Sequence, residues 1–165
     1  MTYTFPIEQQ QENDWCWDAV AVSVDHYFDP LSSWTQETFA ERALGVPLPR
    51  SDQTWYLSDA LAILKRLNGN PRPALSFEEV QQQLDANLPV CVQIDWNEGG
   101  SHYLVISGYS VSAGRTPQVT ISDPILPNSN AIVWDFEAFV YAYSPTYASA
   151  QGAEGTWVET CLVKQ

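Results

Sequence analysis

The stretch EQQQENDWCWDAV, Glu8 to Val20, places a cysteine between two tryptophans immediately before a run with helical spacing. Apolar residues recur there four positions apart as far as Phe28, and Asn13 or Asp14 can cap the first turn. Cys16 therefore lies in the first turn of a predicted helix. The unpaired backbone N–H groups and the positive end of the helix dipole favour a thiolate at that position, which is the nucleophilic form of cysteine.

A cysteine nucleophile needs a base, and the chain has only two histidines, His26 and His102. His26 lies on the same predicted helix as Cys16, about 15 Å along the axis, which is beyond the reach of a hydrogen bond. His102 begins the predicted strand SHYLVISGY after the flexible turn EGGS, where a side chain can face a cleft. His102 is therefore the predicted base.

Asp123, in VTISDP, ends the next predicted strand, and adjacent antiparallel strands can bring its carboxylate to the second nitrogen of His102. Pro124 restricts Asp123 to extended backbone conformations and so helps to hold the carboxylate. Acyl transfer also needs hydrogen-bond donors for the oxyanion. The backbone N–H of Cys16 is one candidate, and a side-chain amide just upstream is another. These residues predict a triad of Cys16, His102 and Asp123.

The composition excludes several classes of partner. The chain has 165 residues, of which 45% are hydrophobic, and a net charge of −13. This is enough apolar surface for the core of one domain, and the negative surface repels nucleic acid and anionic lipid. No apolar run is long enough to cross a bilayer. The N-terminus MTYTFPIEQQ does not resemble a secretory signal peptide, so we expect a cytoplasmic protein, or one exported by another route and delivered to another cell.

The periodicity of the sequence changes at Pro89. Before it, apolar spacings of three or four and capping residues predict four helices; after it, alternation and β-branched residues predict strands. The later helices are expected to begin at Ser32 or Ser33, at Ser58, and at the capping box of Ser76 and Glu79, with Gly45 and Gly69 ending the second and third. The predicted strands are Val90 to Trp96, His102 to Val111, Gln118 to Ser122, Ala131 to Val133 and Thr156 to Val163.

This order of elements predicts a single α+β domain over residues 1–165. Its helical lobe would cover about 1–88 and its antiparallel β lobe 89–165, with the two lobes facing each other across a cleft. Asp135 can cap a short additional helix, and the stretch 144–155 is interpreted as a long loop.

The remaining cysteines and tryptophans have simpler interpretations. Cys91 and Cys161 lie inside apolar predicted strands and are expected to pack in the core, although a disulfide between them stays open. No Cys-x-x-Cys or His-x3-His spacing is present, so no metal site is predicted. One of the two tryptophans beside Cys16 is expected to pack in the helical lobe and the other to cover the cleft. Trp96 and Trp134 are hypothetical residues of a substrate groove.

The motifs Gln-x5-Cys-Trp (Gln10 to Trp17), GGSHYLVISGY and ISDP resemble those of papain-like cysteine proteases. The similarity is greatest to short bacterial members, the effector proteases of plant pathogens, and more distant to staphopains and bacteriocin-leader peptidases. The resemblance implies a nucleophile at Cys16, a base at His102, an orienting residue at Asp123 and an oxyanion donor at Gln10. It also implies a left lobe of helices, a right lobe of antiparallel strands, a peptide or protein substrate, and neither metal nor organic cofactor. Substrate-binding candidates are Trp17, Trp96 and Gly100.

Two departures from the family pattern are present. Short bacterial members commonly read Cys-Trp-Ala-Ala, whereas this chain has Asp18 at the third position, which adds a negative charge near the thiol. Residues two apart on a helix point to roughly opposite sides, so Asp18 is expected to face away from Cys16 with a modest effect. The run of three glutamines around Gln10 leaves the oxyanion assignment open by one residue.

Two other functions stay open. One is an amidase or transferase of the same thiol fold, acting on peptidoglycan or a small amide. The other is a non-catalytic acidic binding or immunity protein on a papain-like scaffold, for which Asp18 is the best support. A cognate inhibitor or immunity protein is also a candidate partner of an active protease.

Overall fold

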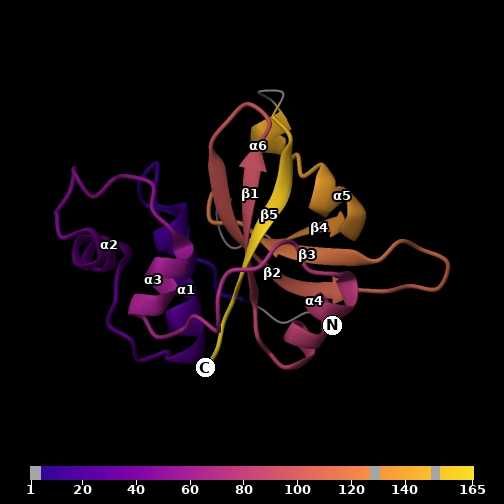
Figure 1. The fold of residues 1–165 in the computed structure, drawn as a ribbon, viewed down its shortest axis with the longest axis horizontal. Helices are drawn as coiled ribbons and strands as arrows, with labels where there is room; N and C mark the ends of the chain where they lie inside the picture. Colours follow the sequence, from indigo (N-terminus) through magenta and orange to yellow (C-terminus); the bar gives the residue numbers. More distant parts are fainter. Residues whose placement is uncertain (1–4, 127–130, 150–152) are drawn as a thin grey trace.

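The computed structural model describes residues 5–126, 131–149 and 153–165 (Figure 1). The first half of the chain forms helices, and the second half forms mainly strands. In chain order they are α1 (Cys16–Phe28), α2 (Gln36–Leu44), α3 (Leu57–Ile63), α4 (Phe77–Asp85), β1 (Val90–Trp96), β2 (Ser101–Ser110), β3 (Gln118–Ser122), β4 (Ile132–Asp135), α5 (Phe136–Tyr141), α6 (Thr146–Ser149) and β5 (Gly155–Leu162).

The strands form one antiparallel sheet in the order β4-β3-β2-β1-β5. In the central pair, Val90 lies opposite Ile106 and Ile94 lies opposite His102. Because β2 and β3 are neighbours, the start of β2 and the end of β3 lie at the same end of the sheet. His102 and Asp123, the predicted base and orienting residue, lie at that end.

Two apolar clusters cover the two faces of the sheet, because side chains alternate along each strand. On one face, residues of α1, α2 and α3 form one apolar cluster with Cys91, Tyr103 and Val105. On the other, α4 and α5 pack against alternate positions such as Val92 and Leu104. Figure 1 shows α1, α2 and α3 grouped on the left of the strands, and α4 and α5 on the right. The α4 helix, which precedes residue 89, therefore packs on the opposite face from the first three helices.

The predicted α+β class and antiparallel sheet are confirmed, and the differences lie mainly at element ends. The capping box of Ser76 and Glu79 forms as expected, and Gly45 ends α2 in the left-handed conformation. However, Thr35 rather than Ser32 or Ser33 caps α2, because it completes its own capping box with Thr38. The third helix ends at Ile63, well before Gly69.

Three further expectations need correction. Neither Asn13 nor Asp14 caps α1, since Trp15 occupies the N-cap without a side-chain hydrogen bond. Asp135 lies at the N-cap of α5 but likewise makes no capping bond. The stretch 144–155 contains the short helix α6, and its residues 150–152 lie outside the described part.

Cys91 and Cys161 lie directly opposite each other on β1 and β5, and both are free thiols in the structure. Both lie buried in the apolar cluster that includes α1, which agrees with their interpretation as packing residues. Within the described ranges, no helix is long and apolar enough to span a membrane.

Candidate active site

Cys16 is the first residue of α1 and is half-buried. The tryptophans on either side are both buried, and their indole N–H groups anchor another segment: Trp15 donates to the carbonyl of Ser51 at 2.7 Å, and Trp17 to that of Gln53 at 2.9 Å. This segment leads directly to Thr54, which lines the same pocket as Cys16. The two tryptophans therefore fix the helix start and one wall of the pocket together.

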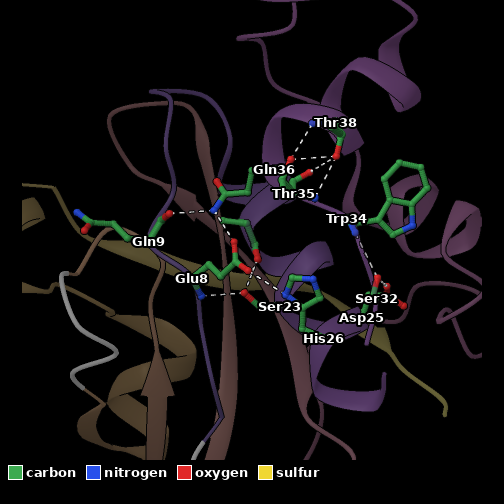
Figure 2. Close-up of polar contacts among 11 residues, drawn as sticks. Glu8, Gln9, Ser23, Asp25, His26, Ser32, Trp34, Thr35, Gln36 and Thr38 are labelled. Carbon is green, nitrogen blue, oxygen red and sulfur yellow. Dashed lines mark hydrogen bonds and ion pairs between the residues drawn. The ribbon is translucent and has the colours of Figure 1, made fainter. Parts of the chain in front are cut away.

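The chain around Gln10 is held by a buried amide from α2 (Figure 2). Gln36 donates from Nε2 to the carbonyl of Gln9 at 2.9 Å, and its Oε1 accepts the N–H of Gln11 at 3.0 Å. The same Nε2 also donates to Glu8, whose carboxylate contacts His26 Nδ1 at 3.0 Å. The Gln36 side chain is thus hydrogen-bonded to the backbone on both sides of Gln10.

Gln10 itself connects the N-terminal segment to the end of β3. Its backbone N–H donates to the carbonyl of Pro124 at 2.9 Å, next to Asp123. Its side-chain Nε2 donates to the carbonyls of Glu12 and Asn13, at 3.0 and 2.9 Å. Gln10 is the one of the three successive glutamines that lines the Cys16 pocket, within the described residues.

His102 and Asp123 form a buried pair in which His102 Nε2 lies 2.8 Å from Asp123 Oδ1. The side chains are 4% and 0% exposed, so water does not compete for this contact. With Nε2 bonded to the carboxylate, Nδ1 is the ring nitrogen that remains for the thiol. Cys16 is close enough to His102 to be one of the groups that raise the pKa of the imidazole.

Asp123 accepts four hydrogen bonds, which fill the acceptor capacity of a carboxylate. Its Oδ1 accepts from His102 and from the backbone N–H of Ile125 at 3.0 Å. Its Oδ2 accepts from the hydroxyls of Tyr143 at 3.0 Å and Tyr147 at 2.6 Å. The carboxylate is therefore fixed in orientation and remains an anion although it is buried.

The charges of the pair follow from these contacts. Burial alone would lower the pKa of His102, but the negative charge of Asp123, its hydrogen bond and the contact with Cys16 raise it to about 10. Burial alone would raise the pKa of Asp123, but the His102 charge and the hydrogen bonds from His102, Tyr147 and Ile125 hold it below its usual value. At neutral pH, the pair is an imidazolium facing a carboxylate.

A pocket of about 350 Å³ lies over these residues. Its lining includes Gln10, Asp14, Cys16, Trp96, His102 and Tyr147. The ring of Trp96 stacks on His102, with centroids 6.3 Å apart and planes at 18°. A larger cavity of about 750 Å³, between α5 and residues 74–76, contains none of the predicted triad.

Of the three substrate-binding candidates, only Trp96 lines this pocket. Trp96 lies in the pocket wall, whereas Gly100 is exposed in the turn before β2 and its neighbour Gly99 lines the pocket instead. Trp17 is not a pocket residue: it is fully buried against Phe39 and Trp55. Its position on α1 turns the indole into the helical core. Neither tryptophan beside Cys16 covers the pocket, because both are anchored in that core.

Asp18 is a buried carboxyl group without the support that Asp123 has. It is 0% exposed, and neither of its oxygens has a hydrogen-bond partner among the described residues. Burial, together with the nearby negative charge of Glu8, raises the pKa of Asp18 to about 9. The expected negative charge near the thiol is therefore absent at neutral pH, since Asp18 is protonated there.

The sequence interpretation missed Tyr143 and Tyr147, the two donors to Asp123 Oδ2. Both lie in or beside the stretch interpreted as a loop, and a tyrosine carries no motif that links it to an aspartate twenty residues earlier. Their spacing of one helical turn was the only available signal.

The described residues contain no group of three or more His, Cys, Asp or Glu side chains placed to hold a metal ion.

Among curated proteins, none matches the chain. The family profile described as papain-like cysteine protease AvrRpt2 matches residues 1–149, which confirms the resemblance found in the sequence. The chain therefore belongs to the papain-like cysteine protease AvrRpt2 family of bacterial effector proteases and is a cysteine peptidase.

Proposed function

We propose that the peptidase acts through Cys16, His102 and Asp123 and an acyl-enzyme intermediate. One observation carries this proposal: His102 contacts Asp123 through Nε2 and interacts with Cys16, although the three residues come from different elements. Because the pKa of His102 is raised to about 10, the imidazole holds a proton at neutral pH and pairs with the Cys16 thiolate.

In the proposed reaction, the Cys16 thiolate attacks the carbonyl carbon of the scissile peptide bond. The backbone N–H of Cys16, in the first turn of α1 where N–H groups have no intrahelical acceptor, donates to the oxyanion. His102 then gives its proton to the leaving amine, and the C–N bond breaks to leave a thioester. Water then attacks the thioester carbonyl and gives a proton to His102, and the C–S bond breaks. This step releases the acyl group as a carboxylic acid and restores the Cys16 thiolate and the His102 imidazolium.

Gln10 supplies the second oxyanion donor in this proposal. Gln10 lines the pocket, but its Nε2 already donates to the carbonyls of Glu12 and Asn13. The amide must therefore exchange one of these acceptors for the oxyanion when the tetrahedral intermediate forms. The grip of Gln36 on the residues on either side keeps the backbone of Gln10 in place during that exchange.

The test compares the two histidines after the nucleophile has been identified. An epoxysuccinyl thiol probe followed by peptide mapping should label Cys16 and neither Cys91 nor Cys161, because those two are buried. Cys16→Ala should abolish peptide hydrolysis, and His102→Ala should lower kcat/KM by about 10³-fold or more.

His26→Ala is the matched control, since His26 contacts Glu8 and is 29% exposed. It should retain activity within about threefold. Equal labelling of the wild type and Cys16→Ala, or equal losses in the two histidine variants, would refute the proposed triad.

The alternative of a non-catalytic acidic binding protein drew its support from Asp18 as a charge near the thiol. That support weakens, because burial keeps Asp18 protonated at neutral pH. An amidase acting on peptidoglycan would use the same three residues. Product analysis after incubation with peptidoglycan and with a protein library distinguishes the two substrates, and we expect cleavage products from the proteins alone.

A further inference from the structure

We propose that Tyr147, assisted by Tyr143, is a positioning residue that holds the Asp123 carboxylate and thereby the His102 ring. The inference rests on the proposed triad. It concerns groups that do not touch the reacting atoms, and its evidence is the geometry around Asp123 Oδ2.

The two hydroxyls are the donors to Asp123 Oδ2 within the described residues, at 2.6 Å from Tyr147 and 3.0 Å from Tyr143. Asp123 is 1% exposed, so water cannot readily replace them. Without these donors, half of a buried carboxylate would be unsatisfied and the group could rotate. Since Oδ1 is the atom that binds His102 Nε2, a rotation at Asp123 would move the imidazole away from Cys16.

Aromatic packing gives the two tyrosines different roles. Tyr143 is fully buried, stacks on Trp96 and lies edge-on to Phe139, so it belongs to the core beneath the pair. Tyr147 is half-buried at the pocket and lies edge-on to His102, with ring centroids 6.3 Å apart. Trp96 completes the enclosure by stacking on the His102 ring. Tyr147 therefore both donates to Asp123 and closes one side of the imidazole.

The hydroxyls act as donors at any working pH. Burial and the negative charge of Asp123 raise the pKa of both tyrosines well above the usual value, so each keeps its proton. In return, the Tyr147 hydrogen bond is one of the contacts that lower the pKa of Asp123. The carboxylate therefore keeps the charge that the His102 imidazolium needs.

The hydrogen bond from Tyr147 to Asp123 can be removed without disturbing the core. The residue lies on the four-residue helix α6, and Ser144 just before it donates to the carbonyl of Ala153 at 2.9 Å. Removal of the Tyr147 hydroxyl leaves the ring and these backbone contacts in place. The substitution therefore changes one donor to Asp123 without creating a cavity.

The experiment compares Tyr147→Phe with the wild type, and uses Tyr141→Phe as the matched control because Tyr141 is 70% exposed. We expect kcat to fall about tenfold in Tyr147→Phe, with KM within about twofold, because the lost bond is a charge-assisted hydrogen bond that does not touch the substrate. Tyr143→Phe should show a smaller fall, and the double variant a larger fall than either. Tyr141→Phe should leave both constants unchanged.

A second readout separates positioning from general destabilisation. With ¹⁵N-labelled histidine, the wild type gives signals from just two rings, so His26 is an internal reference. In Tyr147→Phe, the His102 ring signals and their titration should shift while those of His26 stay in place. Unchanged His102 signals, or a kcat within twofold of the wild type, would overturn the proposal. A wild type without Cys16-dependent hydrolysis would overturn the proposed function, and the NMR comparison would still decide the role of Tyr147.

Discussion

Asp18 in α1 and Asp123 at the end of β3 are both buried aspartates, yet their surroundings give them opposite properties. Asp18 has no hydrogen-bond donor among the described residues, and its pKa is raised to about 9. Asp123 accepts four hydrogen bonds and lies beside an imidazolium, and its pKa is lowered. Burial disfavours the charge of both, so the charge of His102 and the hydrogen-bond donors decide which aspartate is an anion.

The difference shows how the fold gives two buried carboxyl groups different roles. Asp123 is supplied with donors from β2, from its own turn and from the segment 143–147. Asp18 lies on α1, whose apolar residues pack in the core, and the charge that acts on it is the like charge of Glu8. The first is an electrostatic partner for His102, and the second is a neutral core residue.

The largest expected effect comes from breaking the supported carboxylate. Asp123→Ala should lower kcat/KM by about 10²-fold or more, because His102 loses its orienting acceptor. Asp123→Asn keeps an acceptor but removes the charge, so it should retain more activity. Without that charge, the pKa of His102 falls below about 10, and the alkaline limb of kcat/KM against pH moves to lower pH.

Profiles of kcat/KM between pH 5 and 11 for the wild type and both variants check this order. In the wild type, activity should fall as the pH rises through about 10, where the imidazolium loses its proton. An Asp123→Asn profile with the wild-type alkaline limb would show that the carboxylate charge does not set the pKa of His102.

The next effect concerns stability and the unsupported aspartate. The folded protein keeps the Asp18 proton up to about pH 9, whereas the unfolded chain releases it near 3.8. Between these values the unfolded state binds fewer protons, so the free energy of unfolding should fall as pH rises. Asp18→Asn removes this dependence and should stabilise the protein at pH 8 by about 1–3 kcal/mol, allowing for its own buried amide.

Urea denaturation at pH 5, 7 and 8.5 measures the difference. Asp59→Asn is the control, because Asp59 is exposed in the first turn of α3. The stabilising effect of Asp18→Asn should grow from pH 5 to pH 8.5. A constant difference across this range would contradict a protonated Asp18 in the folded protein.

The smallest effect comes from changing the charge that acts on Asp18. Glu8→Gln removes the second cause of the raised pKa, so the pKa of Asp18 should fall below about 9 and the stability curve should level off at lower pH. The substitution also removes the contact with His26. Both side chains are about one-third exposed, so this loss should lower the free energy of unfolding by no more than about 1 kcal/mol. Urea midpoints from pH 7 to 9.5, with the exposed Glu37→Gln as control, test this shift. An unchanged levelling point would exclude Glu8 as a cause.

Much of the fold could be predicted because its signals are local. Strands β1 and β3 have the predicted bounds, and the capping box of Ser76 begins α4, since alternation and capping depend on nearby residues. The candidate base was found by elimination, because the chain has just two histidines and one of them shares a helix with Cys16. His102 and Asp123 then meet because β2 and β3 are neighbours.

The errors have non-local causes. Trp17 was expected to be a substrate-binding residue, but its indole bonds to Gln53, far along the chain, and packs in the core. Asp18 was expected to be a charge, but helical spacing does not reveal that the polar face of α1 is also buried there. Tyr143 and Tyr147 reach Asp123 through a segment whose path depends on the packed sheet.

The sequence by itself determined the class of fold, the order of the elements and the candidates for nucleophile, base and orienting residue, because these rest on short-range periodicity and a small set of reactive residues. The tertiary structure alone decided which carboxyl groups are charged. The charge of Asp18 or Asp123 depends on water exclusion and on donors contributed by distant segments. Desolvation and hydrogen bonding are properties of the packed neighbourhood, and spacing along the chain does not encode them.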